Sequence, residues 1–294
     1  MEKAVYHLPG LFEFYDFYRK FLPIYREKAE YFYDWCQIGS LYGAPADCLW
    51  AGGRVSTGNA DPRQVLALTE AYGLSARLTF SNSLLCPEHL KDPKCNRLCA
   101  LFSAEPGNGV IVHSELLLDY LKERYPNFYF VSSTTKVLTD FEDLAAETER
   151  PDFRYVVPDF RLNKVFDRLA ELKEKRKVEF LCNECCWPGC RERKACYENV
   201  SRKNLGEHCP DHICAAPEGE KGYRFSAAMK NPAFIGIRDI RETYLPMGFS
   251  QFKIEGRGLG SAMLLEFILY YLTKPEYQLP LREEMYLDSM LDLF

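Results

Sequence analysis

The chain has 294 residues, of which 47% are hydrophobic and 27% charged, and its formal net charge is −5. This composition supports a folded chain with a sizeable core and excludes a largely disordered one. The net acidity argues against broad electrostatic binding of nucleic acid or of an anionic membrane. The first residues lack a signal-peptide pattern and no run of about 18 apolar residues occurs, so we expect a cytoplasmic chain with no membrane span.

Eight short runs rich in β-branched and aromatic residues predict strands. Several of them are apolar without alternation, which is typical of strands covered on both faces. The predicted strands are 4–9, 33–39, 76–82, 109–114, 128–134, 154–159, 178–184 and 251–256.

Helical patterns lie between these strands, at 12–32, 61–73, 114–126, 163–177 and 260–272. Pro23 is expected to kink or split the first helix. The second begins with an aspartate cap and a proline, and the third begins with a serine cap. Strands that alternate with helices predict an α/β fold, a (β/α)8 TIM-like barrel formed by a single domain over residues 1–294. A doubly wound open sheet is the alternative.

Polar side chains recur where the predicted strands end, and catalytic groups of a barrel lie at these carboxyl ends. Lys253, Glu255 and Arg257 alternate along the last strand, and three charges on one side of a strand cannot all enter a packed core. We expect them to line the barrel mouth, where they pair with one another or bind a charged substrate. Arg54, in a glycine-rich stretch, is a further candidate for binding an anion. The other predicted strand ends are Pro9 and Gly10, Gln37, Ser81 and Asn82, His113, Ser132 and Ser133, Asp159, and Asn183 and Glu184.

About 66 residues separate the seventh and eighth predicted strands, and most of them form a cysteine-rich insert over 185–250. Within it, Cys186-x3-Cys190 and Cys209-x4-Cys214 are two short-spaced pairs that could bring four thiolates to one zinc ion or iron–sulfur cluster. Cys182-x2-Cys185 is a rival pair that would suit zinc, although Cys182 could equally pack inside the barrel. Disulfides are the weakest interpretation in a reducing compartment. The scattered Cys36, Cys48, Cys86, Cys95 and Cys99 are expected to be buried, with Cys95-x3-Cys99 as an alternative half-site.

Two stretches resemble the collagenase-like peptidase superfamily, peptidase family thirty-two of the unknown catalytic type, and its short single-barrel branch most of all. They are "VEFLCNECCWPGCRERK" (178–194) and "MKNPAFIGIRDIRETYLPMGFSQFKIEGRG" (229–258). In that branch a strand ends in Asn-Glu before a Cys-x3-Cys, and a final strand reads Phe-Lys-Ile-x-Gly-Arg. The superfamily signature has six residues between two cysteines, whereas seven separate Cys182 from Cys190. Cys182, Cys185 and Cys196 therefore remain alternative ligands.

The resemblance implies a four-iron four-sulfur (4Fe-4S) cluster, with zinc as the alternative, and oxygen-independent hydroxylation, which superfamily members perform in ubiquinone synthesis and at RNA bases with prephenate as an oxygen donor. On this basis we expect the cluster on four cysteines, an anionic substrate group on two cations, and acid–base groups near strand ends. The peptidase label is set aside because the sequence has no zinc-protease helix and no convincing nucleophile set. The expected residues are Cys186, Cys190, Cys209 and Cys214 for the cluster, Lys253 and Arg257 for the anion, and Glu184 and His113 for proton transfer.

Two other functions remain open at the level of sequence. One is a metal-stabilised, non-catalytic barrel subunit that pairs with a partner protein or with a second copy, in which Lys253 to Arg257 form an internal ion-pair ring that closes the barrel. The other is RNA binding through residues 191–203, where five of seven charged residues are Lys or Arg. The acidity of the whole chain weighs against RNA binding. In addition, a charged stretch of this kind is more often the solvated face of a helix.

Overall fold

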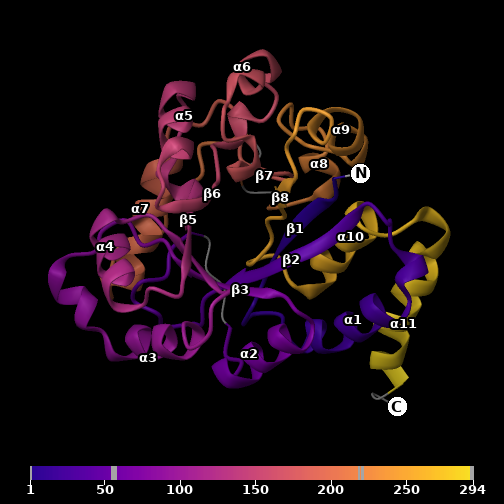
Figure 1. Cartoon of the computed structure of the whole chain (residues 1–294), viewed down its shortest axis with the longest axis horizontal. Coiled ribbons are helices and arrows are strands. Elements are labelled where there is room, and N and C mark those ends of the chain that lie inside the picture. The colour runs from indigo at the N-terminus through magenta and orange to yellow at the C-terminus, as the bar shows by residue number, and fades with distance from the viewer. Residues whose placement is uncertain (1, 54–57, 218, 220–221, 292–294) are drawn as a thin grey trace.

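Eight parallel strands form one sheet in the computed structural model of the chain (Figure 1), which describes residues 2–53, 58–217, 219 and 222–291. The strands follow the order β6-β5-β4-β3-β2-β1-β8-β7, and one isolated bridge between Val156 and Val178 joins the two end strands. The sheet is therefore a nearly closed (β/α)8 barrel, as predicted. The strands are β1 (Ala4–Pro9), β2 (Cys36–Gly43), β3 (Ser75–Phe80), β4 (Gly109–Val112), β5 (Tyr129–Ser132), β6 (Phe153–Val156), β7 (Glu179–Leu181) and β8 (Gln251–Lys253).

Helices surround the sheet in Figure 1. No helix among the described residues is long and apolar enough to cross a membrane. The helices are α1 (Tyr15–Glu27), α2 (Pro62–Ala71), α3 (Pro93–Phe102), α4 (Glu115–Arg124), α5 (Phe141–Glu149), α6 (Phe166–Glu171), α7 (Arg193–Asn204), α8 (Phe225–Ala228), α9 (Ile237–Asp239), α10 (Ser261–Tyr271) and α11 (Gln278–Leu291).

Short polar side chains begin several of these helices in the manner that capping chemistry requires. The Asp61 carboxylate accepts a hydrogen bond from Arg63 N, and the Ser114 hydroxyl accepts one from Leu117 N. Both caps agree with the predictions for 61–73 and 114–126. The first helix is shorter than predicted, but Pro23 lies inside α1 and does not split it.

The predicted bounds were wrong for the second strand and for the helix at 163–177. β2 begins and ends later than the predicted 33–39, because its pairing with β1 starts at Cys36 and continues to Tyr42. Gln37 therefore lies near the amino end of its strand, away from the mouth, and it lines a cavity at the opposite end of the barrel. The predicted helix 163–177 is reduced to the six residues of α6, because Lys175–Lys177 form a separate 3-10 turn.

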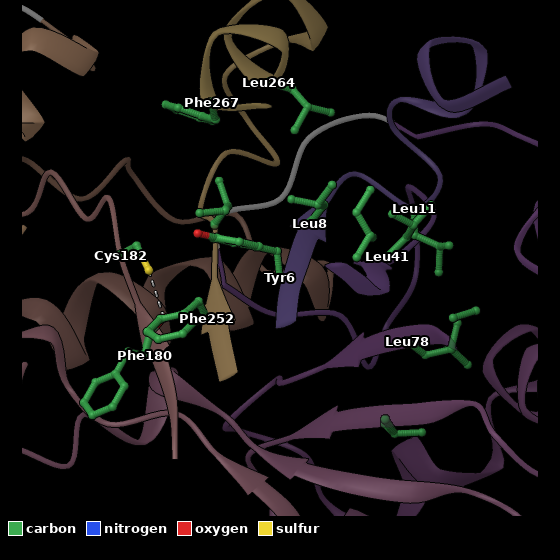
Figure 2. Packing of buried hydrophobic residues seen from close by; sticks show 14 of the residues in the cluster. Tyr6, Leu8, Leu11, Leu41, Leu78, Phe180, Cys182, Phe252, Leu264 and Phe267 are labelled. Carbon is green, nitrogen blue, oxygen red and sulfur yellow. Dashed lines mark hydrogen bonds between the residues drawn. The ribbon is translucent and has the colours of Figure 1, made fainter. Parts of the chain in front are cut away.

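The main apolar core lies between the sheet and the surrounding helices (Figure 2). Side chains alternate across each strand, so Phe252 of β8 enters this core and packs on Tyr6 with ring centroids 6.0 Å apart. Cys182, which follows β7, is fully buried in the same core, and its thiol donates to the carbonyl of Phe180 at 3.6 Å. Cys182 is therefore a packing residue in this structure.

The other face of each strand points into the barrel. A small apolar cluster fills the upper part of this interior, and it consists of Tyr42, Ile111, Val131, Val157 and Leu181. Charged residues lie next to it, because Glu179 and Lys253 are the inward neighbours of Phe180 and Phe252. The interior thus has a layer of apolar side chains near the carboxyl ends of the strands. A group of buried charged side chains lies next to this layer.

Candidate functional site

A pocket of about 310 Å³ opens at the carboxyl ends of the strands, and we call it the mouth pocket. Lys253, Glu255 and Arg257 all line it, which confirms that these three charged residues lie at the barrel mouth. Tyr42 and Leu181 contribute apolar surface to its wall. The pocket therefore combines a largely apolar lining with charge that β8 and the loop after it supply.

Lys253 is buried at the floor of the mouth pocket. Its Nζ lies 3.2 Å from Glu179 Oε1 and 3.5 Å from the centroid of the Tyr42 ring. Burial lowers the pKa of Lys253 to about 8, and the nearby Arg77 acts in the same direction, while Glu179 opposes both. The amine is thus charged at neutral pH but holds its proton less tightly than an ordinary lysine.

Glu179 is the shared partner of the buried cations inside the barrel. Arg77 Nη1 donates to its Oε2 at 2.5 Å, and His7 Nε2 lies 3.5 Å from the same oxygen. Burial opposes the charged carboxylate, but Arg77, His7 and Lys253 together hold the pKa of Glu179 below its ordinary value. Burial lowers the pKa of His7 to about 3, so His7 is neutral at pH 7 and one carboxylate faces two cations.

Arg257 forms a second buried ion pair at the mouth. Its Nε donates to Glu13 Oε1 at 3.0 Å, and both side chains are almost inaccessible. Burial raises the pKa of Glu13, and Arg257 works against that rise. Lys253 and Arg257 therefore each pair with a buried carboxylate, Glu179 and Glu13, and both of these partners lie outside the 253–257 segment that the non-catalytic hypothesis predicts to form a ring.

Three hydroxyl groups of the mouth pocket have no hydrogen-bond partner among the described residues. They are Thr79 Oγ1, Ser81 Oγ and Thr134 Oγ1, all buried and all on residues that line the pocket. Buried polar atoms nearly always have a partner, so these hydroxyls are candidates for contact with a bound molecule. Ser81 was predicted as a strand end. Thr79 was missed, although strand alternation places it on the same face as Arg77.

His113 lies behind the pocket wall. Its Nδ1 is 2.8 Å from the hydroxyl of Thr135, which does line the pocket. Burial lowers the pKa of His113 to about 4, with Lys136 and Lys194 acting in the same direction. The ring is consequently neutral at pH 7 and reaches the pocket only through Thr135.

Glu184 organises the start of the cysteine insert. Its Oε1 accepts hydrogen bonds from the backbone N–H groups of Cys185 and Cys186, each at 2.9 Å, and its Oε2 accepts one from Arg193 at 2.6 Å. Arg193 in turn lies 3.3 Å from Asp159, so one guanidinium links the segments after β6 and β7 to the first turn of α7. These contacts give Glu184 a positioning task beside its predicted role in proton transfer.

A second cavity, of about 700 Å³, lies inside the insert, and we call it the cysteine cavity. Its wall includes Cys185, Cys186, Cys190, Cys196 and Cys214, with His212 as well. Cys209 is not among its lining residues, and the Cys209 sulfur accepts a hydrogen bond from Asn199 at 3.6 Å. The structure therefore brings three of the four predicted cluster ligands to one cavity and adds Cys185 and Cys196.

The two cavities meet at a common wall made of Cys185, Tyr197 and Tyr223. Within residues 2–53, 58–217, 219 and 222–291, no group of three or more His, Cys, Asp or Glu side chains has the geometry to hold a single metal ion. Arg54, the further anion-binding candidate, lies outside the described residues. The thiols thus surround a space that borders the mouth pocket and do not converge on one point.

No family model matches the sequence, and no curated protein matches it. A solved structure of the U32 peptidase Mk0906 superposes with a TM-score of 0.56, covering 88% of this chain and 94% of that chain at 16% sequence identity. At this level of identity the agreement concerns the fold. The chain has the barrel fold of a U32 peptidase structure.

Proposed function

We propose that this chain is an iron–sulfur-dependent barrel enzyme that binds a small anionic substrate in the mouth pocket. The observation that carries the proposal is the wall of Cys185, Tyr197 and Tyr223 that the cysteine cavity shares with that pocket. A cluster held in one cavity would lie next to a substrate held in the other. The proposed reaction is an oxygen-independent hydroxylation, of the kind that the family resemblance implies.

The donor set suits a cluster better than a single zinc ion. A structural zinc needs four ligands around one point, with thiolates at about 2.3 Å from the metal. A 4Fe-4S cluster binds each thiolate at a different iron, so its ligands surround a volume. Cys186, Cys190, Cys196 and Cys214 lie around such a volume, and we propose Cys196 in place of Cys209 as the fourth ligand. When bound, a cluster of this kind supplies electron transfer or a binding site for substrate.

The protein's own groups have distinct tasks in the mouth pocket. Lys253 and Arg257 attract an anionic group through charge-assisted hydrogen bonds, while Glu179 and Glu13 fix the positions of the two cations. The buried hydroxyls on the opposite wall bind uncharged polar atoms of the substrate, and the apolar lining excludes water. His113, neutral at pH 7, exchanges a proton with the pocket through the hydroxyl of Thr135.

Anaerobic purification tests the cluster directly. We expect a broad absorption band that bleaches with dithionite, together with about four irons and four sulfides per chain. Cys186→Ser and Cys190→Ser should each lose most of the iron. Cys36→Ser should retain it, because Cys36 is buried in the core away from the cysteine cavity, where its thiol donates to the Tyr271 carbonyl at 3.7 Å. A colourless protein with one zinc per chain would refute the iron–sulfur proposal.

The fourth ligand is tested by comparing two serine variants of neighbouring cysteines. Cys196→Ser should lose iron about tenfold more readily to a chelator than Cys209→Ser, because Cys196 faces the cavity and Cys209 faces Asn199. The reverse order would return Cys209 to the ligand set.

A non-catalytic barrel subunit is the second candidate, and the buried pairs Lys253–Glu179 and Arg257–Glu13 favour it. Trp187 and Ile213 are 42% and 86% exposed on the insert, where a partner could cover them. Benzoate, a small carboxylate with an apolar ring, separates the two candidates. An enzyme pocket should bind benzoate, as seen by saturation-transfer NMR, and Lys253→Met should abolish the signal. A scaffold should give no signal in either protein.

A further inference from the structure

Two cysteines outside the candidate site lie side by side in the core. Cys48 Sγ and Cys95 Sγ are 3.2 Å apart, although the residues are 47 positions apart in the sequence. Cys48 belongs to the segment after β2, and Cys95 lies in the first turn of α3. Their side chains are 3% and 0% exposed. A disulfide needs a sulfur separation of about 2.05 Å, so a shift of roughly one ångström would join them.

The surroundings of the two sulfurs are not equivalent. Cys48 lies beside Cys95 at the start of α3, close to the backbone amides of Trp50 and Ala51 and to Lys94, and Ala51 N donates to the Cys48 carbonyl at 3.0 Å. The contact with Cys95, these amides and Lys94 lower the pKa of Cys48 in spite of its burial. The pKa of Cys95 is raised by its contact with Cys48 and by burial. The two sulfurs lie within 3.2 Å of each other, so we assign Cys48, whose pKa is lowered, as the attacking thiol and Cys95 as the thiol that resolves the mixed disulfide.

We propose that Cys48 and Cys95 form a reversible dithiol–disulfide pair that reacts with small disulfides. The Cys48 thiolate attacks one sulfur of the small disulfide, forming a mixed disulfide and releasing one thiolate. Cys95 then loses its proton to solvent and attacks the Cys48 sulfur, which releases the second thiolate. The protein pair loses two electrons, and the small disulfide is reduced to two thiols.

The pair is placed to act on one wall of the mouth pocket. Asn82 N donates to the carbonyl of Trp50 at 3.1 Å, and the Asn82 amide donates to the carbonyl of Leu49 at 3.0 Å. Gly53, five residues after Cys48, lines the pocket. A Cys48–Cys95 bond would therefore anchor the segment that carries this wall to α3. Because both sulfurs are buried, the reaction requires local opening of residues 44–53.

A glutathione redox series tests the proposal with the purified full chain. The protein is equilibrated at increasing ratios of oxidised to reduced glutathione, quenched in acid, alkylated and digested for mass spectrometry. We expect a cross-linked peptide containing Cys48 and Cys95, lighter by two hydrogens, which reverts on reduction. Hydrogen exchange of residues 44–53 should slow at least tenfold in the oxidised form.

Two single variants sharpen this test. Cys95→Ser should leave Cys48 as a mixed disulfide with glutathione, because the thiol that would attack the Cys48 sulfur and release glutathione is absent. Cys99→Ser should retain the Cys48–Cys95 cross-link, although Cys99 lies one helical turn further along α3. The proposal is wrong if both thiols stay alkylatable across the whole series, or if Cys48 cross-links to Cys99 instead. Neither result bears on the iron–sulfur proposal, because the iron content is measured separately.

Discussion

The barrel interior and the cysteine insert differ in how their polar and reactive side chains are paired. Inside the barrel, Glu179 contacts Arg77, Lys253 and His7, so the charged groups are satisfied by one another. In the insert, five cysteines lie around a cavity of about 700 Å³. The first arrangement is complete within the chain, whereas the second surrounds a volume that a bound group could fill. We therefore expect loss of one barrel charge to lower stability, and we propose that the insert binds the cofactor.

The contrast predicts that removal of the barrel carboxylate has the largest effect on stability. Glu179→Gln leaves Arg77 and Lys253 buried without a counter-charge, and the loss of a partner from a buried ion pair costs about 3–5 kcal/mol. Chemical denaturation should show this loss in the free energy of unfolding. Glu171→Gln, at an exposed position in α6, is the matched control and should change it by less than about 0.5 kcal/mol. Equal losses in both variants would contradict this expectation.

The same buried cluster predicts an unusual titration of Lys253. The pKa of its amine is lowered from 10.5 to about 8, mainly by burial. In protein labelled at the lysine ε carbon, one NMR resonance should therefore move with a midpoint near pH 8 and be absent from Lys253→Met. Because the charged form is present below that midpoint, affinity for benzoate should be full at pH 7 and fall as the pH rises through about 8. A midpoint above pH 10 would refute this account.

For the insert, we predict that substitution of Arg193 lowers the retention of iron and has little effect on the stability of the barrel. Arg193 holds both Glu184 and Asp159, and Glu184 in turn fixes the amides of Cys185 and Cys186. Arg193→Gln should weaken iron retention about tenfold, in line with other residues that orient metal ligands.

Arg193→Lys should restore part of that retention, because it keeps the charge but loses the forked geometry. Hydrogen exchange should quicken in residues 182–200 and stay unchanged in β1 and β8. Uniformly faster exchange across the whole chain would mean that Arg193 stabilises the fold in general.

The smallest predicted effect lies far from both regions. The Ser114 hydroxyl caps α4 by accepting from Leu117 N at 3.3 Å. Ser114→Ala should cost about 1 kcal/mol of unfolding free energy, measured by thermal or chemical denaturation. Iron content and the Lys253 titration should not change. A change in the iron content or in the Lys253 titration would show that the cap of α4 affects the candidate site, which would contradict the separation of the two regions.

Local patterns were enough to predict the positions of most elements. Seven strands were located close to their observed bounds, because short β-rich runs between helical patterns leave few alternatives. β2 was displaced because Tyr33 and Trp35 have high strand propensity, yet they pack against each other before the strand begins. Helices α3 and α5 were missed, although Asp92 and Asp140 cap them and gave a readable signal.

The site was predictable in position but not in its contacts. The sequence by itself determined the barrel, the placement of Lys253 and Arg257 at its mouth, and a cysteine-rich insert, because these follow from periodicity and from the order of elements. The tertiary structure decided that Glu179 holds Lys253 at the floor of the pocket, and that Cys196 rather than Cys209 lines the cysteine cavity. These contacts join residues whose spacing in the sequence carries no periodic signal. They depend on how the strands close into a barrel and how the insert folds over its mouth.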